Sequence, residues 1–379
     1  MIVQQFLRWM ADAPAPRRAE ATSALARAYL YSDLDESERE AALSAMIFLL
    51  DDPAPGVRRA LAEALARSEA APREVVLALM SDLPEVATVV FRHSPVLLDA
   101  ELVDAVAGLA DPIPVAVARR IGLSAPVAAA IAEVGSLQAC LALLENEHAE
   151  IATFSLTRLV ERHGQAARLR EALLRRPQTP IEIRQMLLQA VGEVLRDHPL
   201  VRRGLSGNRA EAVVVDARER ATVALARAAD NGEMAALAEH LRQSAQLTPA
   251  LLLRAVCTGN ILLFEAALSL LSGLAPPRVF SVLATGRAAS VRALLARAKV
   301  PARMHTLFVV AVEVWREVEG EGADFAAPAT ARRVIERVLT RYQVENGAEV
   351  DDLLVMLRRV SSETAREAAR AYVSRALAA

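Results

Sequence analysis

The chain has 379 residues, of which 54% are apolar, 4% aromatic and 24% charged, and its formal net charge is −2. A disordered chain would hold fewer apolar residues, and a disulfide scaffold would hold more than two cysteines, so both classes are excluded. The near-neutral charge also excludes a uniformly basic nucleic-acid binder.

Helix-forming residues run through almost the whole chain. Leu, Ala, Arg and Glu lose little side-chain entropy in a helix, and apolar residues recur at spacings of three and four. Over residues 57–67, for example, Val57 and Leu61 share one face while Glu63 lies on the other. No long stretch alternates as a strand would. The sequence therefore predicts an all-α protein.

Residues 1–50 predict N-terminal capping helices, over 14–31 and 35–50, with Asp33 or Asp35 as the cap of the second. The beginning of the chain lacks the basic segment and long apolar stretch of a signal peptide. No uncharged run reaches the roughly 18 residues of a membrane span. We therefore expect a soluble, cytoplasmic protein with no membrane partner.

A helical repeat is predicted over residues 51–200. Apolar residues that open helices follow acidic or proline-containing turns at spacings of 29, 29 and 36 residues, and the second helix of each unit opens near a proline. Such helix pairs bury their apolar faces only by stacking, which indicates a short HEAT-like α-solenoid. The openers are Val57, Val86, Val115 and Ile151, and the prolines are Pro72, Pro95 and Pro126.

The break around His198, Pro199, Gly204 and Gly207 predicts a boundary, followed by a second helical domain over residues 201–319. Residues 320–379 are expected to form a linker and a helical tail. The two cysteines lie in apolar helical runs and are expected to be buried free thiols: Cys140 and Cys257.

Four blocks of sequence resemble a bacterial family, mainly alphaproteobacterial, that is catalogued as a domain of unknown function. They are residues 92–97, 217–222, 247–259 and 264–268, and the resemblance covers roughly residues 40–345. It implies a helical, HEAT-like protein with no assigned catalytic residues. Asn260 departs from the acidic residue expected after the Gly259 turn.

No catalytic motif is present. The single lysine, Lys299, is not in a phosphate-binding loop, and the sequence has no Gly-x-Gly-x-x-Gly, His-Glu-x-x-His or Cys-x-x-Cys. We therefore expect no catalytic residue, no metal and no cofactor, and a protein that is not an enzyme.

The six histidines are scattered, and those near helix C-termini are explained by the helix dipole. A sharper alternative makes His163, beside Glu161 and Arg162, a phosphotransfer residue of a signalling phosphorelay. Gly164 argues against it, because a signalling helix would continue there.

Charge is divided along the chain. Residues 1–150 hold 12 arginines and 22 acidic residues, a net charge of −10, whereas residues 151–379 carry +8. Residues 251–312 hold seven basic residues and only one acidic residue, Glu265. These cations either lie on solvated helix faces, pair with the acidic half, or form a surface for an anionic partner, since the planar guanidinium suits carboxylate and phosphate.

The candidate anionic-partner surface consists of Arg254, Arg278, Arg292, Arg297 and Arg303. We expect an acidic protein there rather than nucleic acid, because the aromatic residues of the segment, Phe264, Phe280 and Phe308, occupy core-like positions.

The function predicted is a non-enzymatic protein–protein interaction scaffold or regulatory adaptor. The alternatives are a HEAT-like nucleic-acid binder that uses the arginine surface, and the phosphorelay component. Self-association also stays open, with the acidic half of one chain against the basic half of another.

Overall fold

The computed structural model describes residues 9–10, 12–204, 207–325 and 327–346, with 355, 357–362, 364–366, 369–370 and 373. Within these residues every regular element is helical, which confirms the all-α prediction. The chain divides into two compact units, Met1–Thr179 and Pro180–Ala379. This division precedes the boundary expected near residue 200, because α13 (Ile181–Asp197) packs against α15 (Gly207–Arg227).

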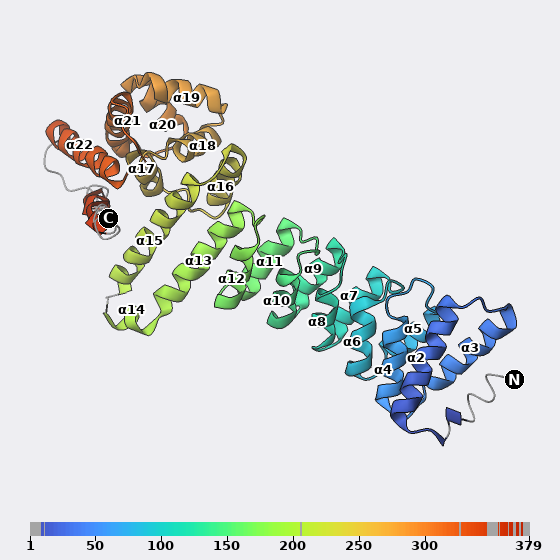
Figure 1. Ribbon diagram of the computed structural model, residues 1–379. Coiled ribbons are helices and arrows are strands. Elements are labelled where there is room, and N and C mark those ends of the chain that lie inside the picture. Colours follow the sequence, from blue (N-terminus) through green and yellow to red (C-terminus); the bar gives the residue numbers. More distant parts are fainter. Residues whose placement is uncertain are drawn as a thin grey trace. The chain divides into compact units, whose positions relative to one another are not determined.

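In the first unit, consecutive helices stack in the manner of a solenoid (Figure 1). Every second helix contacts the next of its series, which forms one continuous layer: α2 (Ala15–Tyr31), α4 (Pro55–Leu65), α6 (Pro84–His93), α8 (Ile113–Ala118), α10 (Leu137–Glu145) and α12 (Ala167–Arg175). The intervening helices are α3 (Glu36–Leu49), α5 (Arg73–Met80), α7 (Asp99–Gly108), α9 (Ala125–Val134) and α11 (Thr153–His163).

The expected repeat register holds for three units and then shifts. Val57, Val86 and Val115 lie on α4, α6 and α8 of the continuous layer, whereas Ile151 directly precedes α11 of the other series. The helix that continues the layer is α10, which Ser136 caps by accepting a hydrogen bond from the Ala139 N–H at 3.1 Å. The repeat pattern did not predict α10, because neither a proline nor an acidic residue lies in the turn just before this helix.

Of the two caps expected for this helix, Asp33 and Asp35, it is Asp35 that caps α3. Its carboxylate accepts a hydrogen bond from the Glu38 N–H at 2.8 Å, and the Glu38 carboxylate accepts one from the Asp35 N–H in return. This reciprocal pair satisfies two of the backbone donors that a helix N-terminus leaves free.

Arginine side chains tie the helices of the first unit to one another. Arg120 at the end of α8 donates to the carbonyl oxygens of Phe91 at 2.5 Å and Ser94 at 2.7 Å, where α6 ends. The last carbonyls of a helix lack intrahelical partners, and a guanidinium can serve two of them at once. The same arrangement joins Arg162 to Ala132 and Gly135, whereas Arg176 donates from a single terminal nitrogen to both Leu144 and Asn146.

We expect Arg120→Ala to lower the free energy of unfolding by about 2 kcal/mol, because two partly buried carbonyls lose a charged donor. Arg120→Lys should recover only part of the loss, since an ammonium lacks the planar fork. Urea unfolding followed by circular dichroism measures both. The neighbouring, exposed Arg119 supplies the control, and Arg119→Ala should change stability by less than about 0.5 kcal/mol. Equal effects at the two positions would contradict the role of Arg120.

The second unit packs its helices around α21 (His305–Gly320), in which nine of the residues are buried. Helices α17 (Pro249–Cys257), α20 (Ala288–Arg297) and α22 (Pro328–Asn346) and the 3₁₀ turn η1 (Ala302–Met304) contact α21. Helix α18 (Ile261–Ser272) contacts α16 (Asn231–Gln243), α17, α19 (Pro276–Thr285) and α20, and α14 (Pro199–Gly204) joins α13 to α15. Phe264 and Phe308 stack in the core with ring centroids 5.9 Å apart. Cys257 here and Cys140 in the first unit are buried free thiols, as expected.

Among the described residues, no single helix is both long and apolar enough to cross a membrane. The pair formed by α18 and α19 meets the length and composition criteria only when the two helices are taken together, and they are bent by 119° relative to each other.

Candidate functional site

Arg254, one of the five arginines expected on a surface, lies inside the second unit. Its side chain on α17 is only 2% exposed and forms an ion pair with Asp216 of α15. Its Nε lies 3.7 Å from Oε2 of Glu219, one turn further along α15. This corrects the expectation that Arg254 faces an anionic partner, because two carboxylates of the chain itself already neutralise it.

Arg254, Asp216, Glu219 and Thr248, which we call the Arg254 cluster, connect α15 to α17. Thr248 donates from Oγ1 to Glu219 Oε1 at 3.1 Å and also caps α17 by accepting from the Leu251 N–H at 3.1 Å. Burial raises the pKa of Glu219, and the charge of Arg254 opposes that shift. Two of the sequence blocks that carry the family resemblance, residues 217–222 and 247–259, therefore meet in space through these side chains.

The other four expected arginines are all exposed, on three consecutive elements of the second unit. We call them the cationic surface: Arg278 on α19, Arg292 and Arg297 on α20, and Arg303 on η1. Helix α20 contacts both α19 and α21, and η1 contacts α21, so the elements that carry the four arginines are neighbours in the unit.

The cationic surface lacks local counter-charges. The sequence holds no acidic residue between Glu265 and Glu313. Within the described residues, Arg278, Arg292 and Arg303 form no ion pair, and the Arg297 Nε donates to the carbonyl oxygen of Ser272 at 2.8 Å. Two further exposed cations, Arg287 and Lys299, flank α20. The surface therefore offers exposed cations that no acidic side chain of the described residues pairs with.

Phe280 belongs to the exterior of the same region, contrary to the expectation that it is a core residue. Half of its side chain is exposed, while Phe264 and Phe308 are fully buried, as expected. The buried face of α19 is defined by Val279 and Leu283, four residues apart, and Phe280 lies about 100° around the helix from Val279. That spacing is the signal from which its exposure could have been predicted.

His163 lies in the last turn of α11 and is partly buried. Burial lowers its pKa, and the charge of Arg162 lowers it further, so the neutral imidazole is favoured. Its part in a phosphorelay stays a prediction. Within the described ranges, no group of three or more His, Cys, Asp or Glu side chains is arranged to hold a metal ion.

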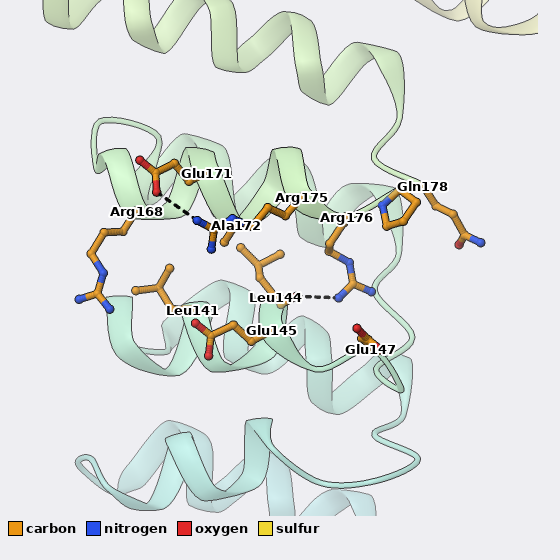
Figure 2. Close-up of a pocket in the computed structure, with 11 residues that line it drawn as sticks. Leu141, Leu144, Glu145, Glu147, Arg168, Glu171, Ala172, Arg175, Arg176 and Gln178 are labelled. Carbon is orange, nitrogen blue, oxygen red and sulfur yellow. Dashed lines mark hydrogen bonds and ion pairs between the residues drawn. The ribbon is translucent and has the colours of Figure 1, made fainter.

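A groove of about 560 Å³ lies between α10 and α12 of the first unit (Figure 2). Leu141 and Leu144 of α10 form an apolar part of its wall, and charged side chains of both signs surround them. Arg175 pairs with Glu171 across one helical turn at 3.7 Å, while Arg176 donates to the Leu144 carbonyl at 2.8 Å and so belongs to the scaffold. With its charges balanced, the groove shows no preference for a ligand of either sign.

Residues 86–346 match the model of a family described as an uncharacterised protein conserved in bacteria (DUF2336). The chain belongs to the DUF2336 family. No curated protein and no solved structure matches the chain. The DUF2336 match begins in α6 and ends with α22, so it includes the Arg254 cluster, the cationic surface and the groove of Figure 2. Helices α2 to α5 lie outside it.

Proposed function

We propose that this DUF2336 protein is a non-enzymatic, cytoplasmic interaction scaffold that binds an acidic protein through the cationic surface. The observation that carries the proposal is the exposure of Arg278, Arg292 and Arg303 without a counter-charge among the described residues. Arginine side chains enrich protein interfaces because their planar forks bind carboxylates in two places.

The architecture supports a binding role. Stacked helix pairs of about 30 residues, tied by arginine, give an extended rigid surface on which a partner can be held without chemistry. We classify the first unit as HEAT-like on this basis, and we expect the family to be mainly alphaproteobacterial. The surface lies in the half of the chain that carries +8, which complements an acidic partner.

Nucleic acid is the second candidate, because the exposed ring of Phe280 lies on the same helix as Arg278 and aromatic rings stack on bases. We favour protein, since one exposed ring offers a single stacking platform. Fluorescence anisotropy with a labelled single-stranded oligonucleotide separates the two. A nucleic-acid binder would show micromolar affinity at low salt that falls steeply as salt rises.

Affinity purification from a native bacterial lysate tests the proposal. We expect the wild-type chain to recover a specific acidic protein, and the triple variant Arg278→Glu, Arg292→Glu, Arg303→Glu to bind that protein about 100-fold more weakly, because each reversal replaces an attraction by a repulsion. The matched control reverses three exposed arginines of the first unit, at Arg67, Arg92 and Arg119, and should retain binding. A partner that both triple variants bind equally well would contradict the cationic surface, and recovery of no specific partner would contradict the scaffold role.

A further inference from the structure

A second groove, of about 410 Å³, lies in the second unit between α16 and α18. It is separate in character from the cationic surface, because its lining is mostly apolar and contains no basic residue. Small side chains contribute to its lining, at Ala235 and Ala238 on α16 and Ala266 on α18. Small residues between two packed helices leave room for side chains from outside to enter.

Two leucines of the groove lining are exposed to solvent. Leu262 is 46% and Leu270 is 37% exposed, although α18 buries most of its other large apolar side chains. Leu262, Ala266 and Leu270 follow one another at intervals of four, so they form a stripe about 12 Å long on one face of the helix. A stripe of that length matches two turns of a helix laid against it.

Glu265 supplies the only charged group of the groove. It is also the only acidic residue in residues 251–312, which otherwise hold seven cations. Nevertheless, no cation among the described residues pairs with it, and burial alone raises its pKa. A carboxylate that is partly removed from water beside apolar walls is stabilised by a cation delivered to it.

We propose that the groove between α16 and α18 binds an amphipathic α-helix of another protein, one whose apolar face packs on Leu262, Ala266 and Leu270 and whose Lys or Arg pairs with Glu265. The charge of the groove selects this occupant, because an acidic helix would bring a second carboxylate to Glu265. The partner is therefore the electrostatic opposite of the acidic protein proposed for the cationic surface.

A displayed library of 20-residue helical peptides, selected on the full-length chain, tests this inference. We expect enriched peptides to share apolar residues at positions i, i+4 and i+7 or i+8, together with a Lys or Arg on the flank of that face. The double variant Leu262→Glu, Leu270→Glu should weaken binding of a synthesised winner about 100-fold, and Glu265→Gln about tenfold. The control Ile121→Glu, Leu174→Glu adds the same two charges at exposed positions of the first unit and should leave the dissociation constant unchanged.

Three results would overturn the inference. One is binding that survives the Leu262→Glu, Leu270→Glu double variant, provided that the thermal midpoint shows the variant to be folded. Another is the enrichment of acidic peptides whose binding is lost in the triple arginine variant, which would support the cationic surface and leave the groove empty. The last is a library that yields no peptide with a dissociation constant below about 100 µM. Replacing the Lys of the peptide by Gln should weaken binding to the wild-type protein tenfold and leave binding to the Glu265→Gln variant unchanged. This result would establish the ion pair.

Discussion

Arg254→Ala should lower the free energy of unfolding of the second unit by about 3–5 kcal/mol, because it leaves the carboxylates of Asp216 and Glu219 close together and without their cation. The chain has two tryptophans, and Trp315 is buried in α21. A Trp9→Phe background therefore makes the fluorescence of Trp315 report on the second unit alone during urea unfolding.

The exposed Arg292 gives the matched control for Arg254. Arg292→Ala should change the free energy of unfolding by less than about 0.5 kcal/mol, because it removes a solvated cation. Arg254→Lys should lie between the two, since it retains the charge but loses the second contact. A loss below about 1 kcal/mol for Arg254→Ala would show that the buried cluster does not hold α15 to α17.

Gly259→Ala is expected to cost about 3 kcal/mol of stability for two separate reasons. Gly259 has a φ of +77°, which disfavours any residue with a Cβ. A Cβ there would also overlap the ring of Phe325 and lie 2.8 Å from its Cβ, so the α21–α22 connection would have to move. The same fluorescence-detected urea unfolding in the Trp9→Phe background measures the change.

A substitution at Gly273 separates the cost of the positive φ from the cost of the overlap with Phe325. It has a φ of +69°, but a Cβ at this position meets no other atom within 4 Å, so Gly273→Ala should cost only about 1 kcal/mol. In a Phe325→Gly background the cost of Gly259→Ala should fall to a similar value, because both the ring and the Cβ of Phe325 are gone. Equal costs at Gly259 and Gly273 in the wild-type background would contradict close packing of Phe325.

Local signals in the sequence were enough to predict most of the fold. Apolar spacing predicted helices throughout, the cap of α3 was narrowed to Asp33 or Asp35, and both cysteines were placed in the core. The prediction failed where a local signal was missing or ambiguous. Helix α10 begins after Ser136, which caps it with a hydroxyl, whereas the neighbouring helices follow a turn with a proline or an acidic residue. The predicted repeat register is therefore wrong from this helix onwards.

The candidate surface was harder to predict, because the sequence around an arginine does not show whether its side chain is buried in an ion pair or exposed to solvent. Arg254 and Arg292 both lie on helices of a basic segment, yet one is buried against two carboxylates and the other faces solvent. What decides between them is the partner across the interface, 38 residues away in the case of Arg254 and Asp216. No local pattern holds that information.

The structural use of arginine side chains explains part of the near absence of lysine. Only one of the 44 basic residues is lysine, and Arg120 and Arg162 each bind a pair of carbonyl oxygens at a helix end through two nitrogens. A lysine cannot supply that planar pair of donors. Part of the arginine excess is therefore structural, and the remainder includes the exposed cations proposed to bind the partner.

Hydrogen exchange measured by mass spectrometry on the chain, alone and with the protein recovered by affinity purification, tests the central claim most directly. The cationic surface predicts that slowed exchange is concentrated in residues 276–304, and that the protection is lost as salt rises because the contacts are ionic. Unchanged exchange over residues 276–304, with protection confined to α10 and α12 around the groove of Figure 2, would contradict it.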